Sequence, residues 1–508
     1  MNNITQSKAL RFSIIDGAFS AIMGSLAGGI FLIGFALKIL GAQLQQIGIL
    51  AALPMFANII QIFGSYIIEK TGKKKLLCFF CVIVSRALWI LIIMLPLAVF
   101  SSLHDSRVWI LVIIIAFSSI FSSLSGVAWL AWMSDLVPEN IRGTYFGKRN
   151  MISSACGMIA ILLGGKFITV WQNRFSENNP FGFIIIFVIG LTAGLIAARF
   201  LSLIPETESV KNEKQLRFKA SDFFQPLKDK NFLTLIFFVS AWMFAVQIAA
   251  PFYGVFMIEN LKIDFSSITV FGTFATFATL FMMKIWGPIS DKLGNKPVII
   301  VSGWILIIVP FIWIFALPGK YYFLVLIAHI LSGAFMAGAS LSQFNILIKL
   351  SPQAGRSVYL AVFAAITGSV GAVAPIAGGV FLKIFEGFSI VVFAHSISNL
   401  HLIFLISSVL QVATIFFILK VKEPEASTPV AVIMQLKNDL NPQVGIASAA
   451  DFIMVEYKRG EGVLKNLDRV TDEAAKKSEE KINNMLNKGE SAIKKPLKKI
   501  NDFLKDDN

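Results

Sequence analysis

Twelve long apolar stretches, separated by short polar segments, occupy the chain up to about residue 420. Each is roughly 20 or more residues long, the length that an α-helix needs to cross the hydrocarbon core of a bilayer. The stretches are continuous rather than alternating, so we predict helices and not the strands of a barrel. The predicted spans are 12–38, 46–68, 76–100, 108–134, 151–171, 181–204, 232–258, 266–290, 297–318, 321–348, 357–384 and 399–420.

The composition agrees with this pattern. The chain has 508 residues, of which 56% are hydrophobic and 15% are charged, whereas soluble domains average about 45–50% apolar and about 25% charged. No short hydrophobic segment with a small-residue cleavage site precedes the first span, so we expect that span to be retained. The predicted fold class is therefore an all-α membrane protein with twelve transmembrane helices.

Basic residues are concentrated in every second loop. The side that holds the N-terminus has nineteen lysines and arginines near the predicted spans, whereas the other side has six. By the positive-inside rule we expect both termini to be cytoplasmic, and we expect a bacterial inner membrane. The net charge of +15 therefore indicates topology, and no nucleic-acid partner is expected. The six residues of the other side are Lys38, Arg107, Arg174, Lys262, Lys320 and Lys383.

The two halves of the apolar region are related by an internal repeat. At a constant offset of 214, seven residues of the first half are identical to residues of the second. Internal repeats are typical of secondary transporters, in which the substrate site lies between the repeats near the middle of the membrane. The expected parts are a first six-helix bundle (1–204), a cytoplasmic linker (205–230), a second six-helix bundle (231–420) and a cytoplasmic tail (421–508). The repeated residues are Pro138, Arg142, Tyr145, Gly157, Ala160, Gly164 and Gly165, matched by Pro352, Arg356, Tyr359, Gly371, Ala374, Gly378 and Gly379.

The tail differs from the rest in composition. From residue 462 onward, apolar residues recur at helical spacing among charges, which predicts an amphipathic helix interrupted near Pro496. A solvated appendage, a helix on the membrane surface and a self-associating helix all fit this pattern. Before it, Pro424, Pro429 and Pro442 predict an irregular segment.

A short basic turn occurs once in each half, at residues 65–74 and 287–296. Each copy has an acid, a lysine, any residue and then a glycine, and the glycine permits a tight reversal of the chain. A carboxylate at the end of a helix can accept from an exposed helix N-terminus and pair with a loop cation at once. Plain topology and turn formation would also explain these charged residues.

The two turns, SYIIEKTGKK and GPISDKLGNK, resemble the signature of the major facilitator superfamily between helices 2 and 3 and between helices 8 and 9. Ser65 stands where the signature has its first glycine, and Pro138-x3-Arg142-Gly143 resembles the loop pattern after helix 4. The resemblance covers residues 12–420 and implies two pseudo-symmetric six-helix bundles that transport by alternating access. It implies that turn residues latch one of the two states. The implied latch residues are Glu69, Lys70, Gly72, Asp291, Lys292 and Gly294, with Arg142 and Arg356 as symmetric partners.

Arg86 is the best single candidate for attracting an anionic substrate, because ionisable residues inside a span are costly and are therefore functional candidates. It lies eleven residues after Lys75. At the rise of an α-helix this is about 16 Å deep, near the middle of the bilayer. A structural arginine bonded to neighbouring polar groups is the alternative, because the family resemblance implies that helices 1, 4, 7 and 10 line the cavity and that helix 3 is peripheral.

The predicted helix 4 carries small and aromatic residues along one face, and the symmetric helix 10 carries a similar series. Such stripes line a substrate cavity or simply allow close helix packing. The residues are Ser118, Ser122, Ser125, Trp129 and Trp132 in helix 4 and His329, Ser332, Met336, Ala339 and Gln343 in helix 10, to which helix 7 adds Trp242 and Gln247.

Asp16 in helix 1 and His329 are the candidate proton carriers. A neighbouring charge or partial burial can bring such groups into the range in which they titrate near neutral pH. For Asp16, a surface ion pair with Arg11 at the membrane edge is the alternative.

No pattern for catalysis is present in the sequence. There is no Gly-x4-Gly-Lys-Ser/Thr loop for nucleotide hydrolysis, and Cys78 and Cys81 lie in an apolar span without a second pair of metal ligands. We therefore predict a secondary transporter of a small organic solute, not an enzyme, with no cofactor. The expected partners are the solute, the lipid bilayer and a coupling ion, a proton by family resemblance, although substrate exchange would also drive transport. A non-transporting membrane receptor with the same fold is the alternative.

Overall fold

The computed structural model describes residues 3–97, 106–138, 141–206, 225–352, 356–392 and 395–440. Within these residues, twelve helices are long and apolar enough to cross a membrane, and they correspond one by one to the predicted spans. The prediction of an all-α protein with twelve spans is thus confirmed. Residues 1–433 form one unit by their contacts, and the architecture below is that of the described residues of this unit.

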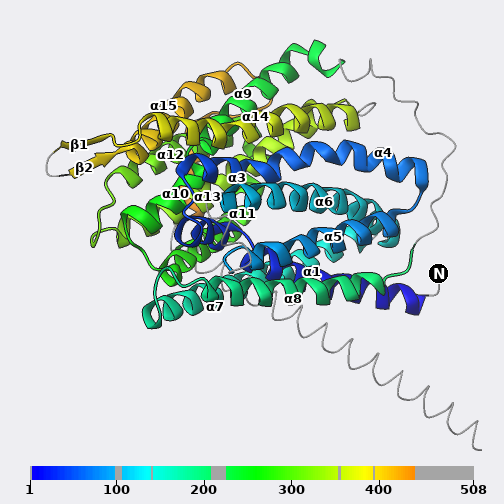
Figure 1. Cartoon of the computed structure of the whole chain (residues 1–508). Helices are drawn as coiled ribbons and strands as arrows, with labels where there is room; N and C mark the ends of the chain where they lie inside the picture. The colour runs from blue at the N-terminus through cyan, green and yellow to red at the C-terminus, as the bar shows by residue number, and fades with distance from the viewer. Residues whose placement is uncertain are drawn as a thin grey trace, which may run out of the picture. The chain divides into compact units, whose positions relative to one another are not determined.

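The first half contains six spans (Figure 1). Spans 1 and 2 are interrupted, so each consists of three consecutive segments. Its elements are α1 (Asn3–Leu26), α2 (Gly29–Gly34), η1 (Phe35–Ile39), α3 (Leu44–Ala57), η2 (Asn58–Ile60), α4 (Gln61–Thr71), α5 (Lys74–Met94), α6 (Arg107–Leu136), α7 (Arg142–Arg174) and α8 (Phe181–Ser202).

The second half repeats this order and adds a two-stranded hairpin before its last span. The strands β1 and β2 are antiparallel, with Ser389 opposite Ser398. Its elements are η6 (Pro226–Lys228), α9 (Lys230–Gln247), α10 (Ala250–Val255), η7 (Phe256–Asn260), α11 (Phe265–Leu293), α12 (Asn295–Ile314), α13 (Tyr322–Leu350), α14 (Arg356–Ile384), β1 (Ser389–Val392), β2 (His395–Ser398), α15 (Asn399–Ile418) and α16 (Pro429–Asp439).

The repeat extends to irregularities of the helices. Span 1 breaks at Gly28 and Gly29, where Gly29 has a φ of +51° that favours glycine, and span 7 breaks before Pro251. Both spans then end in a π-helical turn, η1 and η7. Because π-turns are rare, their recurrence at equivalent places supports the internal symmetry that the sequence predicts.

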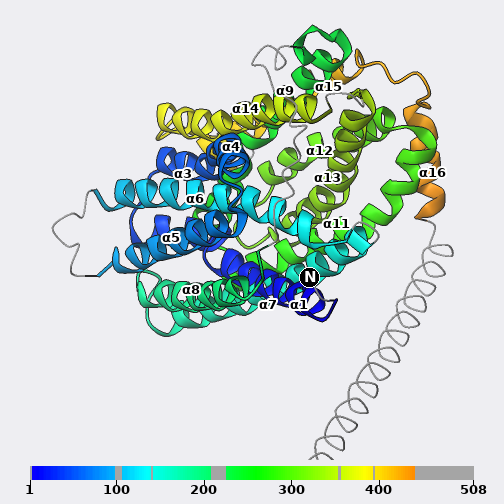
Figure 2. The same cartoon turned by 90° about the vertical axis from the view of Figure 1, so that its right-hand side faces the viewer.

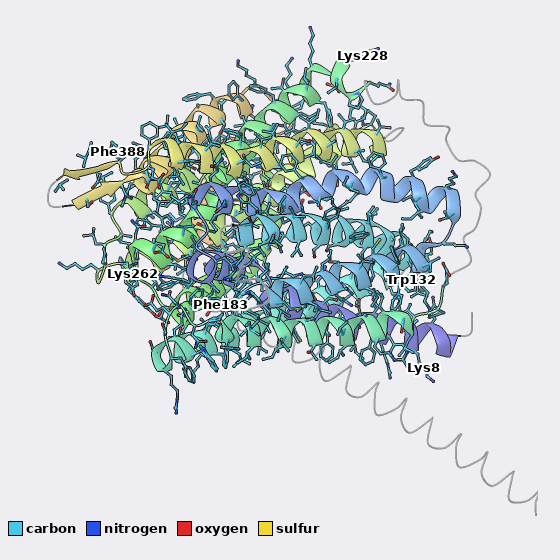
Figure 3. All side chains as sticks on the ribbon, in the orientation of Figure 1. Lys8, Trp132, Phe183, Lys228, Lys262 and Phe388 are labelled. Carbon is cyan, nitrogen blue, oxygen red and sulfur yellow. The ribbon has the colours of Figure 1, made fainter. Side chains whose placement is uncertain are left out.

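The helices run between two ends of the bundle, which we call the N-side and the far side. The N-side is where α1 begins and where the α4–α5 and α11–α12 turns lie; the far side carries the β-hairpin. Lys8 and Lys262 mark the N-side and the far side in Figure 3. In Figure 2, α5 and α8 of the first half lie away from α12 and α13 of the second.

The hydrophobic core is continuous across both halves at the far side and separate at the N-side. One cluster of buried residues joins Phe31 and Phe35 of span 1 to Phe256 of span 7 and Phe265 of span 8. At the N-side, one cluster around Trp132 belongs to the first half alone. Another, which includes Phe232, Trp242 and Tyr359, belongs to the second half alone. The halves therefore share a core only toward the far side.

Small residues allow the halves to approach closely where they meet. α3 packs against α14, and α7 packs against α11. A Cβ on Gly48 of α3 would collide with the backbone of Pro375 in α14, and one on Gly165 of α7 would collide with Thr269 of α11. Glycine at these positions permits the backbone-to-backbone packing that apolar contact alone would not give.

Polar contacts reinforce this closure. Lys38 at the end of span 1 lies 3.3 Å from Glu177 of the first half and 3.3 Å from Glu259 of the second. Thr169 of α7 donates to the carboxylate of Asp264, which precedes α11, at 3.2 Å. The far side is thus held shut by charged and hydroxyl groups as well as by packing.

The segment after the last span differs in part from the prediction. Pro424 lies in an irregular stretch, as expected, but Pro429 begins helix α16. A proline is tolerated at the first helical position because the missing N–H has no partner there in any case. Residues 441–508, including the predicted amphipathic helix from 462 onward, lie outside the described residues, as does most of the predicted linker.

Candidate functional site

A cavity of about 720 Å³ lies among the helices of the first half. Ser122 and Gly126 in its wall are exposed, so the cavity is open along α6. All its lining residues belong to the first six spans. They are Asp16, Ser20, Met23, Gly24, Ala27, Gly28, Gly29, Leu32, Pro54, Asn58, Gln61, Cys78, Val82, Ser85, Arg86, Trp89, Ile115, Ser118, Ser119, Ser122, Ser123, Ser125, Gly126, Trp129, Arg149 and Leu201.

Three charged side chains from three helices line this cavity. Asp16 of α1 pairs with Arg149 of α7 at 3.5 Å and is 4% exposed. Ser20, one turn further along α1, donates to Asp16 at 3.4 Å and accepts from Nη2 of Arg86 at 3.2 Å. The hydroxyl of Ser20 therefore connects Arg86 to the carboxylate of Asp16, and this carboxylate in turn pairs with Arg149. Two positive charges and one negative charge leave the group with a formal excess of one positive charge.

The two arginines are held differently. Arg149 is fixed by several partners, because its Nε donates to the carbonyl of Ser13 at 3.1 Å and its guanidinium lies 4.1 Å from the ring centre of Trp129. Arg86 is 7% exposed, and its Nη1 has no hydrogen-bond partner among the described residues. A buried guanidinium nitrogen without a partner is costly, and an acceptor entering the cavity would satisfy it.

The predicted stripe of helix 4 is part of the wall. Ser118, Ser122, Ser125 and Trp129 of α6 line the cavity, whereas Trp132 is buried in the core of the first half. Ser118 exchanges hydrogen bonds with Ser85 of α5, at 3.0 to 3.2 Å, which ties α5 to α6 beside Arg86. The stripe therefore serves close helix packing at Ser118 and forms an open polar surface at Ser122.

The sequence left open whether Arg86 faces a substrate cavity. In the structure it lies in the wall of the cavity, even though it belongs to span 3. The alternative ion pair of Asp16 with Arg11 is not formed, because Asp16 is buried and pairs with Arg149. Sequence reasoning missed Arg149, because it placed the start of span 5 at residue 151 and counted this arginine among the loop charges. In the structure α7 begins earlier, at Arg142, which brings Arg149 into the helix.

The candidates from the second half do not line this cavity. Trp242 is 3% exposed in the core of that half, and Gln343 is half-buried on α13. Gln247 contacts the sulfur of Met55 at 3.3 Å across the two halves. His329 bonds to the carbonyl of Val325, one turn earlier, at 2.8 Å.

The repeated turns lie at the N-side. Gly72 and Gly294 have φ of +69° and +92° and end α4 and α11, as the motif predicts. Lys70, Asp291 and Lys292 are exposed. Arg142 donates to the carbonyl of Ser134 in its own half at 3.0 Å. The side chains of Glu69 and Arg356 lie outside the described part of the structure.

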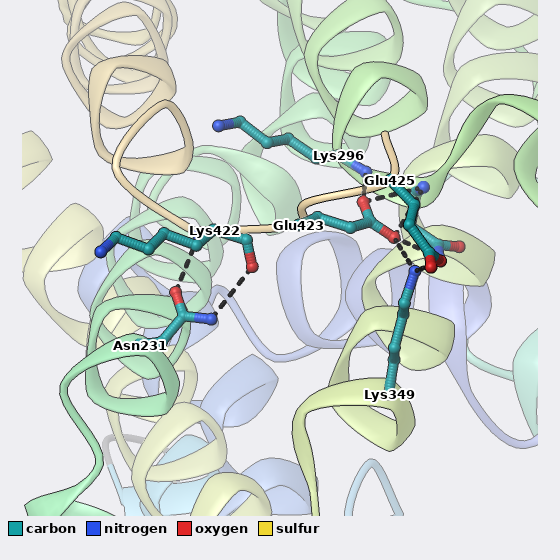
Figure 4. A network of polar contacts seen from close by, with 7 residues as sticks. Asn231, Lys296, Lys349, Lys422, Glu423 and Glu425 are labelled. Carbon is teal, nitrogen blue, oxygen red and sulfur yellow. Dashed lines mark hydrogen bonds and ion pairs between the residues drawn. The ribbon is translucent and has the colours of Figure 1, made fainter. Parts of the chain in front are cut away.

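The turn at 287–296 is anchored by a residue that the sequence analysis did not consider, Glu423 (Figure 4). Its carboxylate accepts from the backbone N–H of Asn295 at 3.1 Å and of Lys296 at 2.7 Å, and it lies 3.5 Å from the ammonium of Lys349. Burial alone would raise the pKa of Glu423, but these donors outweigh it and hold the pKa below its ordinary value. A glutamate capping the start of α12 is favoured by the exposed N–H groups of a helix N-terminus.

No group of three or more His, Cys, Asp and Glu side chains within the described ranges is arranged to hold a metal ion. The side chains that line the cavity include charged, hydroxyl and amide groups, with one carboxylate next to two guanidinium groups. Groups of these kinds can bind and orient the polar groups of a ligand.

The sequence profile of the Major Facilitator Superfamily matches residues 17–253 and 233–459. These matches span most of the chain, so the protein belongs to the Major Facilitator Superfamily. It is accordingly a membrane transporter and not an enzyme. A comparison with curated protein sequences gives no match.

Several solved transporters have a similar fold. The nucleoside transporter NupG is 14% identical, with a TM-score of 0.62 over 83% of this chain and 99% of that chain. A D-xylose-proton symporter is 15% identical, with a TM-score of 0.60 over 83% of this chain and 97% of that one. A bacterial homologue of the human lysosomal transporter Spinster, in an inward-facing state, is 14% identical, with a TM-score of 0.58 over 87% and 100%. At such identities the likeness concerns the fold alone.

Proposed function

We propose that this transporter moves a small organic anion across the membrane by alternating access, and that the cavity of the first half is its binding site. The observation that carries the proposal is the charge of the cavity: Arg86 and Arg149 face one carboxylate, Asp16. Charges inside a membrane protein are costly and are kept where they bind or move ions. An anion bound near Arg86 would neutralise the excess positive charge.

The arrangement of the core supports alternating access. The halves share packing and polar contacts at the far side, whereas each has its own buried cluster at the N-side. In the opposite state the far-side contacts would separate and the N-side would close. The exposed turn residues, such as Lys70 and Asp291, would then meet partners of the other half, which is the latch role that we propose for both turns.

We propose Asp16 as the proton carrier for coupling. Its carboxylate is the single acid among the charged groups that line the cavity, and it is linked to Arg86 through Ser20. Protonation of Asp16 would release both arginines to the substrate, and departure of the substrate would restore the ion pair. His329 stays a second candidate, but it lacks a charged neighbour in the contacts described above.

For orientation, we propose that the N-side faces the cytoplasm of a bacterial inner membrane. The support is the excess of lysine and arginine on that side. With the far side closed, the described state would then face inward.

Transport by purified protein in proteoliposomes tests the proposal. We expect uptake of organic anions, stimulated by an imposed pH gradient, and no uptake of neutral analogues. Arg86→Gln should reduce this flux at least tenfold, because a hydrogen bond to a charged group contributes about 1.5–3 kcal/mol. Arg199→Gln is the matched control, since Arg199 is exposed at the N-side end of α8. Flux of a neutral solute that is insensitive to Arg86→Gln would contradict the proposal.

A further inference from the structure

The polar groups of the cavity are not distributed evenly. Most hydroxyls near Arg86 are already bonded: Ser85 to Ser118, Ser20 to Asp16, and Ser125 to Cys78. These groups have little capacity left for a ligand.

A second set begins beside Ser118 and extends toward the N-side, and its members have free hydrogen-bonding groups. Ser119 and Ser122 of α6 line the cavity, and neither has a hydrogen-bond partner among the described residues. Across from them, the amide oxygen of Asn58 accepts from Gln61 at 3.0 Å and from Ser123 at 3.4 Å. Those bonds leave the amide N–H groups of Asn58 and the amide oxygen of Gln61 for a ligand.

The positions of the two sets can be compared along α6. Ser118 contacts Ser85, the neighbour of Arg86, so Arg86 lies at the level of Ser118. Ser122 is one turn further along α6, which places it about 5–6 Å nearer the N-side. Ser119 directly follows Ser118, so the free hydroxyls extend from the level of Arg86 to one helical turn nearer the N-side.

Resting on the proposed transport function, we infer that the substrate is a hydroxylated organic acid with a single carboxylate. Its carboxylate binds Nη1 of Arg86, and its hydroxyl groups bind Ser119, Ser122 and the free amide groups of Asn58 and Gln61. While Asp16 is ionised, one negative charge matches the formal excess of one positive charge in the cavity. A hydroxyl both donates and accepts, so it satisfies serine hydroxyls, amide N–H groups and an amide oxygen alike.

Binding measurements on the purified full-length protein test this inference. The probes are hydroxylated acids (lactate, glycerate, gluconate and glucuronate), unsubstituted acids of matching length (propionate and hexanoate), and uncharged glucose. We expect at least one hydroxylated acid to bind ten times or more tightly than its unsubstituted counterpart, and no binding of glucose. A site built to hydrogen-bond hydroxyls rejects analogues that lack them, because its polar groups are then left unpaired.

Variants separate the two parts of the site. The double variant Ser119→Ala and Ser122→Ala should weaken binding of the hydroxylated acid about tenfold or more and leave the unsubstituted acid unchanged. Arg86→Gln should weaken both acids. Ser340→Ala is the control, because Ser340 is an exposed serine of α13 outside the cavity. All these serine changes are small, so folding is expected to be retained, and the melting temperature without ligand verifies it.

The outcomes are distinct. Binding of none of the hydroxylated acids, or equal binding of hydroxylated and unsubstituted acids, overturns the inference. If other organic anions are still transported and their flux is lost in Arg86→Gln, the proposed function stands without it. If uncharged glucose binds and Arg86→Gln has no effect, both the inference and the proposed function fail.

Discussion

The two halves follow the same helix plan but have different interiors. The first half buries Asp16 and Arg86 around an open cavity. In the second half, none of the described residues from 230 to 418 that are buried is Asp, Glu, Lys or Arg, and its buried polar groups are hydroxyls, amides and a histidine. The repeat is thus a repeat of backbone and packing, while the charged chemistry belongs to one half. We infer that the first half selects the substrate and that the second half closes over it.

The largest loss in the free energy of unfolding is expected when Asp16, the single acid that lines the cavity, is removed. Asp16→Ala leaves Arg86 and Arg149 without their counter-charge, and breaking a buried ion pair in this way costs about 3–5 kcal/mol. Unfolding in detergent, followed by thermal or denaturant titration, measures it. The matched control is Asp135→Ala, since Asp135 also pairs with a basic residue, Lys74, but is 35% exposed. That pair should contribute about 0–1 kcal/mol.

Equal stability of the Asp16→Ala and wild-type proteins would mean that Asp16 does not stabilise the buried arginines of the first half. The presence of buried charges in one half alone would then make no difference to the stability of that half. Asp16→Asn, which keeps the shape and an acceptor oxygen, should lie between the two.

In the second half, the acid with the largest expected contribution to stability is Glu423, which lies after the last span, at the N-side. Glu423→Gln removes a carboxylate that accepts from two backbone N–H groups and lies beside Lys349, so we expect a loss of about 2 kcal/mol at pH 7. Since the pKa of Glu423 in the folded protein is below its ordinary value, this stabilisation is present above about pH 4.3 and is lost as the pH falls toward the folded pKa. Glu425→Gln is the control, because Glu425 pairs with the same Lys349 but is 88% exposed.

The measurement is the melting temperature from pH 7 down to pH 3.5. The gap between wild type and Glu423→Gln should be constant near neutral pH and should narrow as the pH falls through about 4.3 toward the folded pKa. A gap that widens at low pH would show that Glu423 does not act as an ionised cap of α12.

A smaller effect, on the ratio of far-side-closed to far-side-open molecules, is expected where the two halves meet. Lys38→Ala removes the ammonium that joins Glu177 to Glu259 across the halves, and Lys38 is only 14% exposed. Loss of about 1 kcal/mol would change the ratio of far-side-closed to far-side-open molecules about fivefold. Lys262→Ala is the control, because Lys262 pairs with the same Glu259 from within the second half and is 65% exposed.

Distances between spin labels at Ser176 and Lys320, which lie on the far side in different halves, report this ratio. We expect a longer distance to gain population in Lys38→Ala and not in Lys262→Ala. Identical distributions in both variants would indicate that the remaining contacts, namely the packing of α3 with α14 and of α7 with α11 and the bond of Thr169 to Asp264, keep the far side closed.

The number and order of the spans followed from the sequence, because continuous apolar stretches have few alternatives in a bilayer. The glycines of the turns also followed, since Gly72 and Gly294 adopt the positive φ that the motif requires. The position of Arg149 inside a helix did not follow. Hydropathy locates only the apolar part of a span, and α7 begins at Arg142, well before its apolar part. Glu423 did not follow either, because its role depends on a contact with residues 295 and 296 that no local pattern encodes.

The smallest effect is expected at His329, and this expectation separates the two candidate proton carriers. Its ring lies between Trp313 and Phe271, with ring centres 5.6 and 5.7 Å away, and its Nδ1 bonds to a carbonyl of its own helix. His329→Phe keeps these ring contacts, so transport and its response to a pH gradient should stay within twofold of wild type. Asp16→Asn should abolish that response. If His329→Phe instead removes the response while Asp16→Asn retains it, the coupling group lies in the second half. The inference that the charged groups of the first half select and couple the substrate is then wrong.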